Sequence, residues 1–320
     1  MRHVAHRLSI ALIACTLAAP AMAQTAKPPL PPAPAPQADT VPDAAFGAYQ
    51  RGLYLTALSE ASKRAQQGDA AAMTLLGELY ANGFGVGRDD VKAAQWYKQA
   101  AALGNRDALF TLAMFAFEGR AGARNTTEAA RLMGEAAKFG HPAANYNLAL
   151  LYLQGQEFKQ DFKRAAELLR VAADAGNPEA QYALATMYKE GRGVPKDVQQ
   201  AALLMAKASI AGNLDAMVEF AIAQFNGDGI EKDESAAARL FLIAARRGSP
   251  IAQNRLARIL MAGRGTAADA TAAIRWHIIA KQAGAGDPEL DVFASRQPQT
   301  VRDAANTAAR KWLAGDIMAR

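Results

Sequence analysis

Glycine recurs along this chain at a fixed interval of 36 residues, in two separate series. The chain has 25 glycines among 320 residues, so chance does not explain so many at one interval. Helices often end in a left-handed backbone conformation, which costs glycine least. Two series therefore predict two helix ends in each of several tandem repeats: Gly68, Gly104, Gly140, Gly176, Gly212, Gly248 and Gly284, and Gly83, Gly119, Gly155, Gly191, Gly227 and Gly263.

A third series, with the same interval, predicts where the second helix of each repeat begins. Aspartate and asparagine side chains accept hydrogen bonds from the unpaired amides of a first helical turn. Glu128 and Gln200 lie three residues after two of these caps and predict capping boxes there. The predicted caps are Asp89, Asn125, Asp161, Asp197, Asp233 and Asp269.

Small and large apolar residues also keep this interval. The chain is 51% hydrophobic but only 7% aromatic, so a large core has to be built mostly from alanine and leucine. The spacing is helical, and no segment has the alternation of a strand. The sequence predicts an all-α fold, with closely packed alanines at Ala72, Ala108, Ala144, Ala180, Ala216 and Ala252 in the first helices and Ala93, Ala129, Ala165, Ala201, Ala237 and Ala273 in the second.

The periodic pattern also predicts the domain boundaries. A half repeat covers residues 46–67 and six full repeats cover 68–283. Trp312 lies one interval after Trp276, so residues 284–320 are predicted to form a terminal repeat that caps the stack. We expect one elongated domain over residues 46–320.

The N-terminal residues predict export. Basic Arg2 and Arg7 precede the apolar run 8–19, and the segment ending at Ala23 fits a signal-peptidase site, so residues 1–23 are predicted to be a signal peptide. A competing interpretation takes residues 12–15 as a lipobox, which would attach lipid to Cys15. Residues 24–45 contain a proline-rich run and are predicted to be an extended linker. No later stretch is long and apolar enough to span a membrane.

The repeats resemble those of the Sel-one-like repeat (SLR) family, relatives of the tetratricopeptide repeats. The resemblance covers about residues 46–285 and is strongest in LGELYANGFGV (76–86), KAAQWYKQAA (92–101) and YALATMYKEGRGVPKD (182–197). The loop after the first helix has a second glycine in this family pattern, as at Gly85. Two repeats lack this second glycine and have Ala121 and Glu157 at its position. The resemblance implies a right-handed solenoid of antiparallel helix pairs that acts as an adaptor for other proteins. Some cysteine-rich relatives are linked to β-lactam binding, but their cysteine pairs are absent here.

The sequence favours neither catalysis nor nucleic-acid binding. Basic and acidic residues alternate and the net charge is only +6, so we expect solvated helix faces and no nucleic-acid partner. No cluster has metal-ligand spacing, and no strand precedes the glycine loops to make a phosphate site, so no cofactor is expected. His141 occupies a helix-capping position and His277 a core position.

The predicted partner-binding surface is the concave face, which the first helices line in helical-pair repeats. Steps of three and four residues along those helices give one stripe per repeat. The alternative is that the same side chains are buried between neighbouring repeats. The candidate binding residues are Phe110, Met114, Phe117, Tyr146, Leu150, Leu153, Tyr182, Lys189, Ile222, Phe225 and Arg258.

We therefore predict a non-enzymatic scaffold of the bacterial cell envelope, periplasmic or secreted, that binds a protein or peptide. A cell-wall or β-lactam-directed hydrolase is the alternative, and it would need paired carboxylates or a nucleophile with a base in one cleft, such as Glu78 or Glu219 with His141. A purely structural subunit without an exchangeable ligand is a third interpretation.

Overall fold

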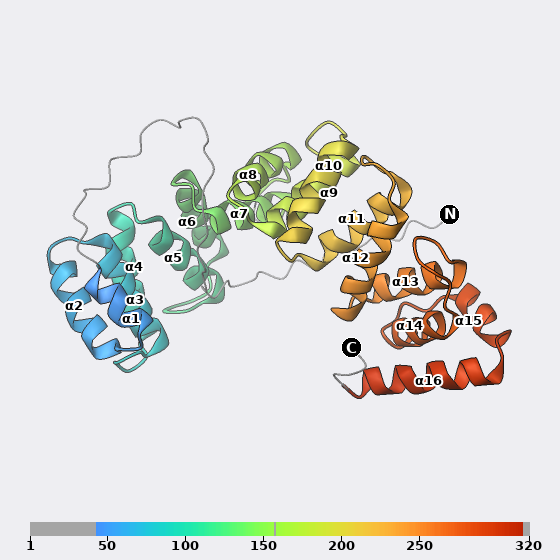
Figure 1. Ribbon diagram of the computed structural model, residues 1–320. Helices are drawn as coiled ribbons and strands as arrows, with labels where there is room; N and C mark the ends of the chain where they lie inside the picture. The colour runs from blue at the N-terminus through green and yellow to red at the C-terminus, as the bar shows by residue number, and fades with distance from the viewer. Residues whose placement is uncertain (1–42, 157, 316–320) are drawn as a thin grey trace. The chain divides into compact units, whose positions relative to one another are not determined.

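The computed structural model describes residues 43–156 and 158–315, and this part of the chain folds into helices without strands (Figure 1). Residues 1–42, with the predicted signal peptide, Cys15 and most of the proline-rich linker, lie outside the described residues. The helices of the described part are α1 (Ala44–Gln50), α2 (Tyr54–Gln66), α3 (Ala70–Asn82), α4 (Asp90–Ala102), α5 (Arg106–Glu118), α6 (Thr126–Lys138), α7 (Pro142–Gln154), α8 (Phe162–Asp174), α9 (Pro178–Glu190), α10 (Val198–Ile210), α11 (Leu214–Asn226), α12 (Glu234–Arg246), α13 (Pro250–Ala262), α14 (Ala270–Gln282), α15 (Pro288–Ser295) and α16 (Gln299–Leu313).

The predicted helix starts are confirmed. Each cap of a second helix accepts a hydrogen bond from the amide three residues later, at 2.8–2.9 Å. The prediction of capping boxes is wrong for the second hydrogen bond, in which the side chain of Glu128 or Gln200 would accept from the N–H of the cap residue. The N–H groups of Asn125 and Asp197 donate to the carbonyls of Ala116 and Tyr188. The side chain of Glu128 instead accepts hydrogen bonds from Arg131.

Both glycine series end helices, as predicted. Gly83 and its counterparts at 119, 191, 227 and 263 have φ between 66° and 85° and cap the first helices. A second loop glycine, Gly193, also has positive φ, and a Cβ there would lie 2.2 Å from the carbonyl oxygen of Phe162. The glycines of this loop therefore allow close backbone packing, which explains their spacing without a phosphate site. Ala121 keeps the same left-handed conformation, with φ of 59°.

Successive repeats are joined by a contact that we call the inter-repeat clasp. In each clasp, a loop residue after a first helix contacts the first residue of the second helix in the preceding repeat. Its chemistry varies: Phe84 stacks on Tyr54 at 4.5 Å, Arg120 pairs with Asp90 at 2.6 Å, Arg192 lies 4.4 Å over the ring of Phe162, and Arg264 pairs with Glu234. The Arg120 guanidinium lowers the pKa of Asp90 to about 2.

Alanine packing builds the core. The two helices of each repeat pack together, as in α3 with α4 and α13 with α14. The periodic alanines of both helices are buried, which lets the paired helices approach closely. Larger apolar residues that keep the 36-residue interval are mostly buried too, as Leu76 and Leu112 are, whereas Trp96, Phe220 and Leu240 are half-buried.

The segment predicted to be a terminal repeat contains α15 and α16, which pack on α14. Helix α16 packs against α14, and its Trp312 contacts Trp276 edge to face, with the ring centroids 5.0 Å apart. The first helix of this segment, α15, has only 8 residues, whereas first helices such as α3 have 13. The terminal repeat therefore buries apolar surface of α14 that would otherwise face solvent.

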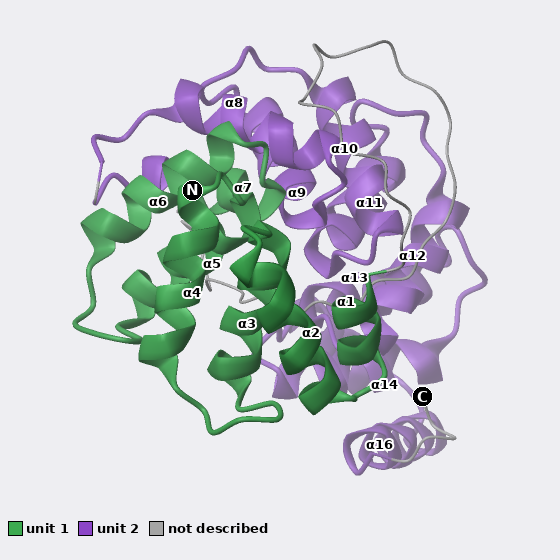
Figure 2. Ribbon diagram, turned by 90° about the vertical axis from the view of Figure 1, so that its left-hand side faces the viewer, with its two compact units in different colours: residues 1–150 green, residues 151–320 purple. Residues whose placement is uncertain are grey.

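The chain divides into two compact units, one ending at Leu150 and one beginning at Leu151 (Figure 2). Each repeat of such a protein contacts only its neighbours, so contacts within a group of repeats outnumber those to the rest of the chain. Among the described helices, none has the length and apolar character needed to cross a membrane.

Candidate functional site

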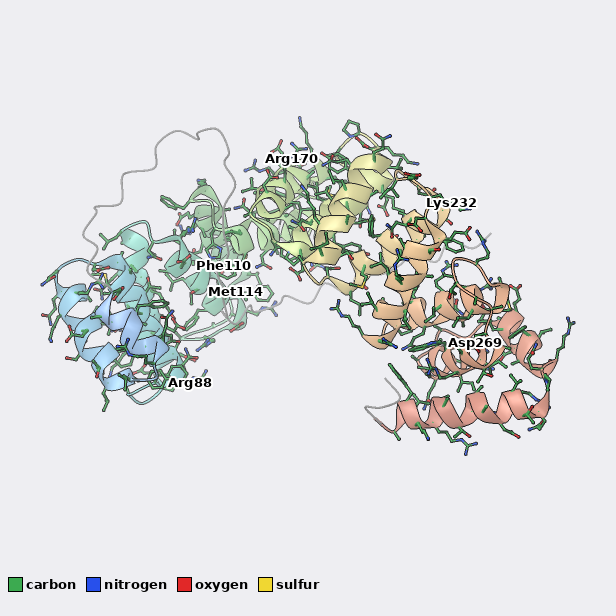
Figure 3. The ribbon with its side chains drawn as sticks, viewed as in Figure 1. Arg88, Phe110, Met114, Arg170, Lys232 and Asp269 are labelled. Atoms are coloured by element: carbon green, nitrogen blue, oxygen red, sulfur yellow. The ribbon has the colours of Figure 1, made fainter. Side chains whose placement is uncertain are left out.

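In the N-terminal unit, the predicted binding residues lie on α5 and α7. Phe110, Met114 and Phe117 are half-buried on α5, and Figure 3 labels the first two on that helix. Phe110 stacks on the imidazole of His141, with centroids 4.4 Å apart. Tyr146 on α7 is also half-buried, whereas Leu150 is only 3% exposed and lies in the core, where a partner would not reach it.

In the C-terminal unit, the predicted residues lie on α7, α9, α11 and α13. Leu153, Tyr182, Ile222, Phe225 and Arg258 are half-buried, and Lys189 is exposed. Burial and the nearby carboxylate of Glu219 raise the pKa of Tyr182 to about 12. Lys189 pairs with Glu219 at 2.7 Å across successive first helices.

The structure brings three of these residues to one cavity. Ile222 and Phe225 of α11 and Arg258 of α13 line a cavity of about 320 Å³. Met261 and Arg264 line it as well, and the Arg264 guanidinium lies 4.3 Å over the ring of Phe225. This cavity has apolar walls with arginines among its lining residues, a combination common where proteins hold a partner side chain.

The two histidines of the described chain have the structural roles that the sequence predicted. The Nδ1 atom of His141 accepts a hydrogen bond from the N–H of Ala144 at 3.1 Å, so His141 caps α7. His277 is 2% exposed, and its Nε2 lies 2.8 Å from a carboxylate oxygen of Asp291.

The cap formed by His141 should make stability depend on pH. Burial lowers the pKa of His141, although Asp107 opposes the shift. The folded state then binds fewer protons than the unfolded state, so this stabilisation is present above the unfolded pKa of about 6.5 and is lost as the pH falls through the folded pKa. Protonation also removes the lone pair that accepts from Ala144, which costs about 1 kcal/mol as a lost cap.

Urea unfolding of the wild type at pH 7 and pH 5, compared with His141→Asn, measures this effect. Asparagine caps the equivalent helices at Asn105, Asn177 and Asn213 and does not titrate. We expect the variant to lose less stability than the wild type between the two pH values. An equal loss in both proteins would show that His141 is not the titrating cap.

The residues named as an example for the hydrolase alternative each have another partner. Glu78 accepts a hydrogen bond from the hydroxyl of Tyr49 at 2.6 Å, Glu219 pairs with Lys189, and His141 caps α7. Within residues 43–156 and 158–315, no group of histidine, cysteine or carboxylate side chains has the arrangement of a metal site. These contacts give the hydrolase alternative no support.

Sequence reasoning missed the polar links between successive first helices. Arg258 pairs with Asp287 at 2.5 Å and with Glu289 at 3.1 Å, and Lys189 pairs with Glu219. The partners are separated by about 30 residues, not by the 36-residue interval of the repeat. Opposite charges at this second spacing are the signal that would have found them.

Comparisons with known proteins agree with this architecture. The Sel1 repeat model matches six consecutive segments, residues 70–105, 106–141, 142–177, 178–213, 214–249 and 250–284. A comparison with curated proteins gives no match.

Two solved structures are similar to the chain. One is a Sel1 repeat protein from Oxalobacter formigenes, with 27% identity and a TM-score of 0.63 over 75% of this chain and 97% of that one. The other is c5321, a protective antigen of uropathogenic Escherichia coli that displays an SLR fold, with 25% identity and a TM-score of 0.59 over 85% of this chain and 68% of that one. The six segments that match the Sel1 repeat model span more than half of the residues of this chain. The chain therefore belongs to the Sel1 repeat family, whose members are generally protein-interaction scaffolds.

Proposed function

We propose that this protein is a non-enzymatic scaffold of the bacterial cell envelope that holds a protein or peptide on the face of its first helices. The observation that carries the proposal is the incomplete burial of large side chains along that face. Phe110, Met114 and Tyr146 in one unit and Tyr182 and Phe225 in the other are only half-buried. Aromatic side chains dominate binding energy when a partner desolvates them.

The proposed location depends on the N-terminal sequence. An apolar run after two arginines supports export, with cleavage after Ala23, and the proline-rich segment that follows supports a spacer. A periplasmic regulator or assembly factor fits this arrangement. Mass spectrometry of the mature protein should find Gln24 at its N-terminus, whereas a lipid on Cys15 would favour the lipoprotein interpretation.

Substituting two tyrosines of the first-helix face tests the proposed function. The double variant Tyr146→Ala with Tyr182→Ala should reduce capture of the partner at least about tenfold in a crosslinking pull-down from the envelope fraction, since two aromatic contacts of about 1 kcal/mol or more would be lost. Its thermal melting should remain cooperative and helical.

A matched control separates this face from the rest of the surface. Leu203 and Ile210 on α10 are 50% and 88% exposed, so replacing both with alanine removes apolar surface outside the first helices. This control should capture the partner as the wild type does. Equal losses in the two double variants would contradict the proposal, as would loss of the melting transition in the tyrosine variant.

A further inference from the structure

The cavity in the C-terminal unit is apolar inside and basic at its edge. Ile222, Phe225 and Met261 line it with half-buried apolar surface, and Phe241 and Ile259 belong to the buried core beneath them. Its volume of about 320 Å³ is at the lower end of the range for small-molecule sites. A cavity of this size suits one large side chain of a partner better than a whole cofactor.

Two of the three arginines that line this cavity already bind carboxylates. Arg258 pairs with Asp287 and Glu289, and Arg264 pairs with Glu234 while it covers the ring of Phe225. The planar guanidinium group matches a carboxylate well and is easier to desolvate than an ammonium group. The edge of the cavity is therefore built to hold carboxylates beside an aromatic surface.

Arg255 is the third arginine, and its charge is not balanced in the same way. Its side chain is exposed, and within the described ranges it forms no salt bridge. The acidic residue that lines the cavity among the described residues, Glu289, pairs with Arg258. A carboxylate from outside the chain would complete the pattern of the other two arginines.

Arg255 and Arg258 also line a second hollow, of about 490 Å³, toward α15. Exposed Ile251 and the segment 285–288 line this hollow. The two arginines of α13 therefore separate two hollows that a short extended segment can cross. The basic residues lie at the middle of such a path. Apolar side chains of the first cavity lie on one side, and Ile251, Pro288 and the carboxylate of Asp287, which pairs with Arg258, lie on the other.

We propose that this site takes a short acidic segment of a partner protein, which inserts one large apolar side chain between α11 and α13 and pairs a carboxylate with Arg255. The proposal rests on the proposed scaffold function and names the chemistry of the segment that one part of the first-helix face recognises. A basic segment fits less well, because its lysines would lie beside the guanidinium of Arg255, which no carboxylate neutralises within the described ranges.

Fluorescence anisotropy with three fluorescein-labelled peptides tests the proposal. The probes are GSDFDSG, GSKFKSG and GSDADSG, which vary the charge and the apolar side chain separately. We expect GSDFDSG to bind the full-length protein roughly tenfold more tightly than either of the other two, which corresponds to about 1.4 kcal/mol. Equal binding of the acidic and basic probes would overturn the proposal.

Two variants and a control assign the binding to this site. Arg255→Glu should weaken GSDFDSG roughly fivefold and favour GSKFKSG, and Ile222→Trp should weaken GSDFDSG by filling the cavity. Arg239→Glu makes the same charge change at an exposed position of α12 and should leave binding unchanged. An equal effect of Arg239→Glu and Arg255→Glu would indicate attraction by net charge alone and would overturn the assignment.

Two other outcomes would also overturn this inference. Sedimentation that shows a dimer dissociated by Arg255→Glu would make a second copy of the chain the occupant. If the peptides fail to bind while the variant of Tyr146 and Tyr182 still loses its partner, the acidic segment is wrong and the scaffold function stands. Those tyrosines do not line this cavity, so the two failures are distinguishable.

Discussion

Replacing Trp276 with alanine is expected to lower the free energy of unfolding of the C-terminal unit by about 4 kcal/mol, a loss typical of replacing a fully buried tryptophan with alanine. Trp276 is 1% exposed and belongs to the core cluster that includes Leu290, Ala309 and Trp312. Its removal leaves a cavity and deprives Trp312 of its ring partner. Because α16 packs mainly on α14, we expect the terminal helix to detach first.

Urea unfolding and hydrogen exchange measure the effect of Trp276→Ala. Trp96 occupies the same position in the first full repeat but is only half-buried, so Trp96→Ala is the matched control, with an expected loss of about 2 kcal/mol or less. Amides of α16 should exchange faster in Trp276→Ala, while those of α3 to α6 should not change. Similar losses for both variants, or full protection of α16, would contradict this account of the terminal repeat.

The second large effect is expected for Gly193→Ala, with a loss of about 3 kcal/mol. The residue has φ of +72°, where a side chain is strained by about 1 kcal/mol, and the new Cβ would lie 2.2 Å from the carbonyl oxygen of Phe162. Relief of this clash requires the loop to move away from α8, which adds a penalty of about 2 kcal/mol from overpacking. The movement also separates Arg192 from the ring of Phe162 and so opens the inter-repeat clasp.

Gly212→Ala is the matched control for this substitution. Gly212 also has positive φ, but a Cβ there would meet nothing within 4 Å. Its replacement should therefore show the conformational cost alone, about 1 kcal/mol. If chemical denaturation gives the two variants the same midpoint, close packing of the loop against the previous repeat does not contribute to stability.

The elements that the sequence predicts well are those set by local chemistry. An aspartate before an apolar run marks the start of a helix, and a glycine after such a run marks its end. Gly191 therefore ends α9 and Asp197 begins α10, as the sequence pattern predicts. The capping role of His141 could be predicted because asparagine occupies the same position in other repeats. Trp312 could be placed against the core because it keeps the interval of Trp276.

The features that the sequence did not predict depend on the turn from one repeat to the next. Tyr146 and Leu150 lie on one stripe of α7, but Leu150 is buried, because a helical spacing does not tell which side of a stripe a neighbouring helix covers. The cavity beside Arg258 has the same origin. Its lining residues Ile222, Arg258 and Glu289 lie on successive first helices, about 30 or more positions apart in the sequence.

Photo-crosslinking in living cells tests most directly whether the first helices form the working surface. Separate variants carry a benzophenone amino acid at Phe110, at Tyr182, or at the outer positions Leu203 and Ile210. The scaffold account predicts that the first two variants form a covalent adduct with the same partner and that the outer two do not. Adducts from the outer positions alone, with none from Phe110 or Tyr182, would contradict it.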